Sequence, residues 1–232
     1  MSNTIAVIPA RGGSKRVPRK NVRLFKEQPL LAWSIKAAQA VDEIDRVVVS
    51  TDDAETANIA ENYGAEVFWR PEELAADTSS TFDVLKHVYL EQCKATDLDP
   101  EYLVLLQPTS PLREQTLISK ALAILKSHPE ADRLIELNVQ SLFTGRIDSG
   151  YWVSDFPEST RSQELPELYF PSGRLYIYKC STTIAVNNPE GGNTNFVLGD
   201  YATNINIDYE SDFNKLEFVF NSHGKNYHYL LD

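Results

Sequence analysis

Blocks of apolar and polar positions alternate along the first 127 residues and predict strands and helices in turn. Short continuous apolar runs that end in polar residues or proline are typical of buried strands in a parallel sheet. Such runs occupy residues 5–8, 45–51, 66–69 and 102–107. Between them, apolar side chains recur at helical intervals, which predicts helices over residues 28–40, 54–63, 78–91 and 116–127. The alternation predicts an α/β fold in which helices cover both faces of a mostly parallel sheet.

The pattern is less regular in the second half of the chain. It predicts further strands at residues 132–138, 175–178 and 227–231, and a helix over residues 211–220. Residues 197–198 and 205–208 are expected to add late strand and loop structure. Aromatics, glycines and charges follow no clean period after residue 140, so we expect an excursion from the sheet at about residues 139–172. Because 232 residues can bury one sizeable core, residues 1–232 are expected to form a single domain.

Charge and composition narrow the function classes. The formal net charge of −11 argues against general nucleic-acid binding, because an acidic surface repels a phosphate backbone. Seven of the 22 Lys and Arg residues nevertheless lie between Arg11 and Lys26, which favours one focused anionic ligand. The sequence has no signal-type apolar region and no run of 18 apolar residues, so we expect neither secretion nor a membrane span. Cys93 and Cys180 are expected to be reduced core residues in a cytoplasmic protein.

The first apolar run opens onto a basic loop that contains two adjacent glycines. Gly12 and Gly13 lack Cβ atoms, so backbone N–H groups there can approach phosphate oxygens closely. Basic side chains that could neutralise a polyphosphate surround them, at Arg11, Lys15, Arg16, Arg19 and Lys20. A solvated basic turn is the ordinary alternative. The position of the loop, directly after a buried strand, favours the phosphate site, because open α/β sheets bind ligands at the carboxyl ends of strands.

Two common phosphate loops do not match this stretch. A Walker loop requires a Gly-Lys pair followed by Ser or Thr, but Gly13 is followed by Ser14. The dinucleotide fingerprint requires three spaced glycines, whereas Gly12 and Gly13 are adjacent and no third glycine follows. The loop is therefore neither a kinase-type loop nor a dinucleotide site.

Four blocks of sequence resemble the CMP-sialic acid synthetase (acylneuraminate cytidylyltransferase) family, which includes CMP-legionaminic and CMP-pseudaminic acid synthetases. The blocks are I-P-A-R-G-G-S-K with Lys20-Asn21, V-V-S-T-D-D at residues 48–53, Y-G-A-E with Arg70-Pro71, and L-L-Q-P-T-S-P-L-R at residues 105–113. They occur in family order and cover roughly the first half of the chain. The resemblance implies a Rossmann-like nucleotidyltransferase of the GT-A-like type, a three-layer sandwich.

The resemblance also implies an activity. A cytidylyltransferase of this family activates a sialic-acid-like nonulosonic acid with CTP, giving the CMP-sugar and pyrophosphate, and requires Mg²⁺. Relatives use the region that matches the excursion to reach a partner subunit, so a homodimer is expected. Alternatives are a nucleotidyltransferase for another sugar or base, and a catalytically weakened nucleotide- or sugar-binding homologue.

The resemblance also implies roles for specific residues, both in these blocks and in later stretches, such as residues 161–169, which resemble the family's R-x-Q-x-x-P-x-x-Y stretch. Charge accumulates on phosphate oxygens in the expected reaction, so cations and positioning groups are required. Catalytic roles are expected for Arg11, Lys20 and Asp208. Nucleotide contacts are expected from Ala10, Arg11, Gly12, Gly13, Ser14, Lys15, Asn21, Arg70 and Ser80. Substrate contacts are expected from Gln107, Arg161, Gln163, Ser172 and Tyr176.

Several of these residues have simpler alternatives. Ser80 could be a helix N-cap, and Gln107 could cap a nearby helix at the end of its strand. Arg70 could form a surface salt bridge, and Arg113 could be a surface residue at a helix start. Asp52 and Asp53 are read as a helix-start pair or a contact on the nucleotide side.

The chain departs from the family pattern at two places. Where the family has Asn-Gly-Ala ahead of Tyr176, this chain has Ser172-Gly173-Arg174. Where the family has two aspartates that share Mg²⁺, this chain has Asn206 and Asp208. One carboxylate and one amide are expected to hold the metal with help from triphosphate oxygens, and to bind it more weakly without nucleotide. Asp212 is read as a helix-start residue.

Overall fold

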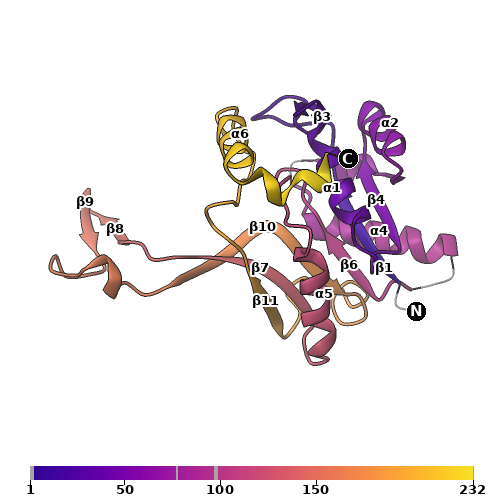
Figure 1. Cartoon of the computed structure of the whole chain (residues 1–232). Coiled ribbons are helices and arrows are strands. Elements are labelled where there is room, and N and C mark those ends of the chain that lie inside the picture. The colour runs from indigo at the N-terminus through magenta and orange to yellow at the C-terminus, as the bar shows by residue number, and fades with distance from the viewer. Residues whose placement is uncertain (1–2, 77, 97–98, 232) are drawn as a thin grey trace.

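The computed structural model describes residues 3–76, 78–96 and 99–231, and a seven-stranded sheet lies at its centre (Figure 1). The strand order is β11-β7-β10-β6-β1-β4-β5. The strands are β1 (Thr4–Pro9), β4 (Arg46–Thr51), β5 (Glu66–Trp69), β6 (Tyr102–Leu105), β7 (Arg133–Gln140), β10 (Leu168–Lys179) and β11 (Thr194–Leu198). β10 runs antiparallel to β6 and β7, and the remaining pairs are parallel. The predicted mostly parallel sheet is confirmed.

Helices cover both faces of this sheet, which makes a three-layer sandwich. α1 (Leu30–Gln39), α2 (Ala54–Asn62) and α5 (Leu117–Ser127) pack on one face, and α4 (Thr81–Thr96) packs on the other. Successive side chains of a strand point to opposite faces. Accordingly, Ala6 and Ile8 of β1 pack in the core beneath α1, whereas Ile5 and Val7 pack beneath α4.

The C-terminal part covers the outer side of α1. Helix α6 (Asp212–His223) packs there through Phe220, whose ring lies 5.6 Å from those of Phe25 and Trp33. Two short 3-10 helices follow, η3 (Gly224–Asn226) and η4 (His228–Leu230). The strand predicted at residues 227–231 is therefore wrong. Tyr227 and Leu230 are both fully buried, and a spacing of three places them on one side of a helical turn.

Residues 139–172 include the segment that leaves the sheet. β7 and β10 remain paired as far as Gln140 and Leu168, and the chain between them forms a long arm that projects from the body (Figure 1). A hairpin of β8 (Gly145–Asp148) and β9 (Tyr151–Ser154) lies at the tip of the arm. The 3-10 helix η2 (Ser162–Glu164) lies on the return path.

The remaining elements are short. They are η1 (Lys20–Val22), β2 (Leu24–Phe25), β3 (Gln28–Pro29) and α3 (Glu72–Ala75). The helix predicted over residues 78–91 begins at Thr81 and continues to Thr96. Residues 205–208 form no strand, although the Ile207 N–H donates to the Thr109 carbonyl at 2.7 Å. Within the described residues, no helix combines the length and the apolar character needed to cross a membrane.

Candidate active site

A cleft lies at the carboxyl ends of the parallel strands, where the loops after β1, β5 and β6 meet the segment before α6. Its volume is about 350 Å³. Parallel strands bring their carboxyl ends to one edge of the sheet, which is where open α/β sheets bind ligands. The cleft is lined by Pro9, Arg11, Gly13, Ser14, Lys20, Asn21, Arg70, Leu74, Ala76, Ser79, Ser80, Thr81, Val84, Gln107, Pro108, Thr109, Asn206 and Asp208.

Two aspartates that follow β4 hold the glycine-containing loop in place. The Gly12 N–H donates to Asp52 Oδ1 at 2.9 Å, and an added Cβ on Gly12 would lie 2.7 Å from Asp53 Cβ. Only glycine therefore fits this approach. Asp53 also accepts from the Thr56 N–H and so caps α2. The loop is thereby tied to the start of a helix.

Residues at the start of α2 also hold the C-terminal end of the loop, through Arg19. Arg19 has a left-handed φ of 57°, and its guanidinium donates to Asp53 at 2.8 Å and also pairs with Glu55. The hydrogen bond from Arg19 lowers the pKa of Asp53 to about 2, so this carboxylate stays charged at neutral pH. Asn21 closes the loop by donating to the Arg11 carbonyl at 2.9 Å.

Lys20 joins the loop to the C-terminal part of the chain. Its Nζ donates to the Ile207 carbonyl at 2.6 Å and lies 3.9 Å from Asp208 Oδ1. Burial lowers the pKa of Lys20, and the nearby Asp208 carboxylate opposes that shift. Arg16 approaches the same carboxylate oxygen at 3.4 Å. Two cations thus converge on Asp208 at the mouth of the cleft.

Arg70 supplies a buried cation to another wall. Its guanidinium donates to the Ser50 carbonyl at 2.9 Å and contacts the Ser50 hydroxyl and the Leu74 carbonyl. Burial lowers the pKa of Arg70, while Asp52 opposes the shift. The alternative of a surface salt bridge is wrong, because Arg70 is buried and its hydrogen bonds go to neutral oxygens. A buried cation beside a cleft favours an anionic ligand.

The wall opposite the loop carries amide and carboxylate groups. Gln107 and Thr109 follow β6, and Asn206 donates to Asp208 Oδ2 at 2.7 Å. Asp212 starts α6, as expected, and its carboxylate accepts from the backbone N–H groups of Asp208 and Tyr209. The position of Asp208 is therefore fixed from both sides.

The cleft brings together residues predicted from sequence positions almost two hundred residues apart. Ten of the predicted residues line the cleft. They are Arg11, Gly13, Ser14, Lys20, Asn21, Arg70, Ser80, Gln107, Asn206 and Asp208. Ala10, Gly12 and Lys15 lie in the same loop outside the lining. Ala10 is buried and donates its N–H to the Ser50 carbonyl.

Four predicted substrate residues lie outside the cleft lining. Arg161 and Gln163 are exposed on the return path of the arm, beside and within η2. Ser172 and Tyr176 belong to β10, and the Ser172 hydroxyl donates to the buried Glu136 carboxylate at 2.6 Å. Of the predicted substrate residues, Gln107 alone is in the described lining of the cleft.

Two alternatives can be decided. Ser80 and Asp83 exchange hydrogen bonds between their side chains and backbone N–H groups, so the N-cap reading of Ser80 holds, and the residue also lines the cleft. The alternative that Arg113 is a surface residue at a helix start is wrong, because its side chain is fully buried. It donates to the carbonyls of Gln107 and Arg174 and to the Ser34 hydroxyl. The sequence pattern around Arg113 gave no signal of that burial.

The Gly12–Asp53 contact predicts unequal effects for two neighbouring substitutions. Gly12→Ala forces Cβ into Asp53 and should lower the free energy of unfolding by about 1–3 kcal/mol, as overpacking does. Gly13→Ala is the matched control, since an added Cβ there meets no atom within 4 Å. Thermal unfolding without ligand measures both. Equal melting temperatures for the two variants would contradict the account of the loop.

The sequence of this chain is similar to those of known cytidylyltransferases. The family model described as cytidylyltransferase matches residues 5–166. The chain is 31% identical over 216 residues to an N-acylneuraminate cytidylyltransferase of Escherichia coli, covering 90% of this chain and 50% of that protein. It is 30% identical over 229 residues to the post-translational flagellin modification protein B of Campylobacter coli, covering 94% and 95%.

A third relative and one solved structure extend the comparison. The chain is 44% identical over 123 residues to a CMP-N,N'-diacetyllegionaminic acid synthase of Legionella pneumophila, covering 53% of each protein. It therefore spans about half the length of the E. coli and Legionella relatives. A CMP:2-keto-3-deoxy-manno-octonic acid synthetase complexed with CTP has the same fold, with a TM-score of 0.72, 18% identity, and coverage of 95% of this chain and 99% of that one. The matched family model and the nearly full-length relative show that this chain belongs to the cytidylyltransferase family.

Proposed function

We propose that this protein is a CTP-dependent cytidylyltransferase that activates a nonulosonic acid, releasing pyrophosphate and the CMP-sugar. The observation that carries the proposal is the meeting of Lys20 and Asp208 in one cleft with Arg11 and Arg70. The cleft thus holds three cations and one carboxylate where a triphosphate and an acceptor could meet. Relatives named for sialic and legionaminic acids support the choice of acceptor class.

The proposed reaction is an in-line displacement at the α-phosphorus of CTP. The anomeric hydroxyl oxygen of the sugar forms the new bond to phosphorus, while the bond to the oxygen bridging to the β-phosphate breaks and pyrophosphate leaves. Arg11, Lys20 and the backbone N–H groups of Gly13 and Ser14 hold the triphosphate and stabilise the negative charge of the transition state. Gln107 orients the acceptor through its amide. Asp208 accepts the proton of the attacking hydroxyl.

Mg²⁺ fits this donor set as a partly protein-bound ion. Asp208 and Asn206 offer a carboxylate and an amide oxygen in the cleft, and oxygen ligands suit Mg²⁺. No cluster of three or more His, Cys, Asp or Glu side chains suited to a metal occurs among the described residues. The ion would therefore need water and triphosphate oxygens as well. When bound, it would supply further positive charge to the phosphates.

Asn206 gives a prediction about metal affinity. Asn206→Asp should tighten Mg²⁺ binding without nucleotide by on the order of tenfold, because ligand charge raises affinity for hard cations. The readout is the Mg²⁺ dependence of the melting temperature. Asn214→Asp, on the exposed side of α6, is the control that adds the same charge outside the cleft. An equal response of the two variants would argue against a metal site at residues 206 and 208.

We also infer a cytoplasmic homodimer, built through the arm. The exposed fractions of Ile147, Tyr151 and Trp152 at its tip are 71%, 76% and 58%, and such apolar groups favour a protein contact. The cytoplasm supplies CTP and keeps the two free thiols reduced. A single-chain mass in sedimentation equilibrium would contradict the dimer, and recovery from a periplasmic fraction would contradict the location.

The activity is tested by pyrophosphate release on mixing the protein with Mg²⁺, a nucleoside triphosphate and a panel of sialic, legionaminic, pseudaminic and Kdo-type acids. CTP with one of these acids should give turnover, and removal of Mg²⁺ should abolish it. Lys20→Met should lower kcat/KM by about 100-fold or more, since it removes a cation from the transition state. Lys26→Met is the matched control, because Lys26 pairs with Glu217 outside the cleft.

Three results would revise the proposal. Preference for another nucleotide would indicate a different base, and turnover only with an aldose phosphate would indicate a different acceptor. Binding of CTP without turnover of any acceptor would indicate a nucleotide-binding homologue.

A further inference from the structure

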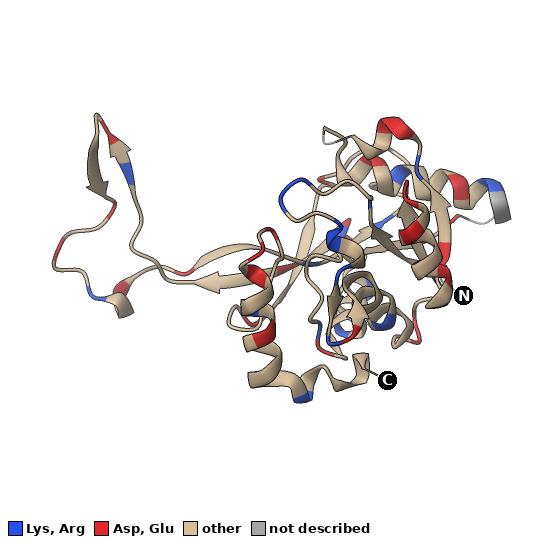
Figure 2. Cartoon of the chain, turned by 90° about the horizontal axis from the view of Figure 1, so that it is seen from above, with Lys and Arg blue, Asp and Glu red and all other residues tan. Residues whose placement is uncertain are grey.

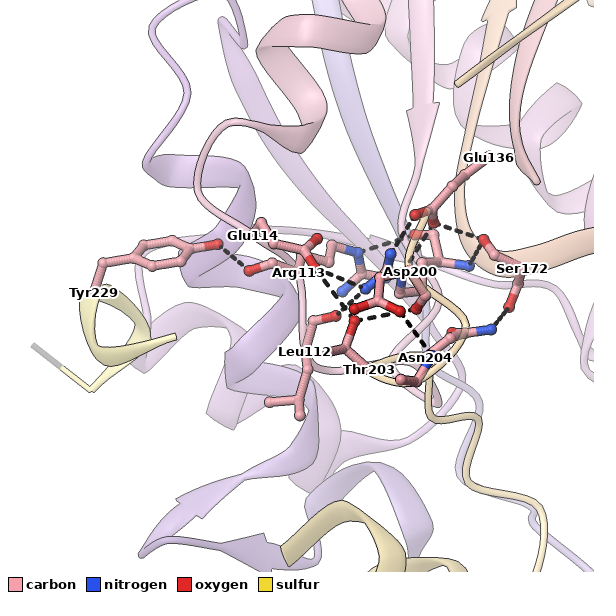
Figure 3. Close-up of polar contacts among 11 residues, drawn as sticks. Leu112, Arg113, Glu114, Glu136, Ser172, Asp200, Thr203, Asn204 and Tyr229 are labelled. Carbon is pink, nitrogen blue, oxygen red and sulfur yellow. Dashed lines mark hydrogen bonds and ion pairs between the residues drawn. The ribbon is translucent and has the colours of Figure 1, made fainter. Parts of the chain in front are cut away.

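A buried network of charged side chains lies behind the acceptor wall of the cleft, between β7, β10 and the segment that leads to Asp208 (Figure 3). Glu136 and Arg174 form an ion pair at its centre, and both side chains are almost completely buried. Arg174 Nε donates to Glu136 Oε2 at 3.0 Å, and the second guanidinium nitrogen contacts Oε1. The Glu136 charge raises the pKa of Arg174 although burial opposes the shift.

The ion pair organises the irregular turn in β10. The Ser172 hydroxyl donates to Glu136 and accepts from the Arg174 N–H at 3.0 Å. Gly173 lies between them with a left-handed φ of +83°. An added Cβ on Gly173 would lie 3.6 Å from Ser110 Oγ and 3.8 Å from Gln107 Oε1. The turn that the pair shapes therefore lies directly against the Gln107 amide.

Arg113 fixes the same region from the other side. It donates to the Arg174 carbonyl at 2.9 Å, to the Gln107 carbonyl at 2.9 Å and to the Ser34 hydroxyl at 3.0 Å. Complete burial lowers its pKa to about 10, which leaves it charged at neutral pH. The Arg113 carbonyl in turn accepts from the Tyr229 hydroxyl (Figure 3).

The network also reaches the segment that carries Asn206 and Asp208. Asn204 Nδ2 donates to the Ser172 carbonyl at 3.0 Å. Gly199 approaches the ion pair so closely that an added Cβ would lie 2.8 Å from Arg174 Nη2 and overlap the Glu136 carboxylate. Both ends of the 199–204 stretch are thus anchored to the network, immediately before Asn206.

We propose that Arg174, through its buried pair with Glu136, is a positioning residue that sets the affinity for the acceptor by fixing the Gln107 wall and the 199–208 segment. This inference rests on the proposed function and deepens it. Buried ion pairs often add no net stability compared with an apolar pair, whereas they do fix geometry in some proteins.

The experiment compares the buried pair with a more exposed Arg–Glu pair in the same sheet. The double variant Glu136→Gln/Arg174→Met removes both charges of the buried pair. It also takes away the Arg174 contact of the half-buried Glu114, which lies 3.4 Å from the Arg174 guanidinium. The control Glu66→Gln/Arg46→Met removes the Arg–Glu pair between β4 and β5, outside the cleft lining. A third variant, Arg174→Lys, keeps the positive charge and should raise KM for the acceptor less than the double variant does.

The first readout compares the change in KM for the acceptor with the change in KM for CTP. In the Glu136/Arg174 variant, KM for the acceptor should rise by about tenfold or more, which is several-fold more than any rise in KM for CTP. The control should change neither constant. An unchanged acceptor KM, or an equal rise of both constants, would overturn the proposal, since a purely structural role predicts no such split.

The second readout does not need turnover. Hydrogen exchange should become faster in residues 107–114 and 199–208 of the Glu136/Arg174 variant, and stay unchanged in residues 10–21. Unchanged exchange in the first two segments, or faster exchange throughout the chain, would overturn the positioning role. Absence of turnover in the parent protein would instead count against the proposed function, while the exchange data would still decide the positioning role.

Discussion

The cleft depends on the contact between the Lys20 ammonium group and the Ile207–Asp208 segment. The hydrogen bond from Lys20 to the Ile207 carbonyl joins residues 187 positions apart and brings the basic loop to the only carboxylate in the described cleft lining. Ile207 is fully buried in the cluster between α1 and α6, so the core itself holds one partner of this contact. The other partner is held by the loop. The site therefore exists only when the basic loop after β1 is in place and the C-terminal part of the chain is packed on α1.

Electrostatics explains how an acidic protein can present a cationic cleft. Acidic side chains, red in Figure 2, are spread over the chain, and the formal net charge is −11. Asp53 is paired with Arg19 and caps α2, and Asp52 accepts from the Gly12 N–H and favours the charged form of Arg70. The charge of Arg11, Lys20 and Arg70 thus remains directed at the cleft, where a polyphosphate would be attracted.

The sequence pattern predicted the sheet, its helices and the phosphate loop, because these follow from local apolar periodicity and glycine placement. It failed where long-range packing decides. Residues 227–231 look like a strand but form helical turns on α1 and α6, because Tyr227 and Leu230, three residues apart, are buried together in the cluster with these helices. Arg113 resembles a surface residue in the sequence, and its buried guanidinium is satisfied by the carbonyl of Arg174 in the distant strand β10 as well as by the nearby Gln107 carbonyl. Asp52 and Asp53 looked like a helix start, and their role in holding Gly12 required the parallel pairing of β1 with β4.

The most direct test of the account is a crystal structure of the protein with CTP and Mg²⁺. The account predicts the triphosphate beside Lys20 and the Gly13–Ser14 backbone, in the cleft where Asp208 and Asn206 would hold Mg²⁺. A triphosphate bound elsewhere, with Lys20 and Asp208 still paired to each other and the cleft free of nucleotide, would contradict it.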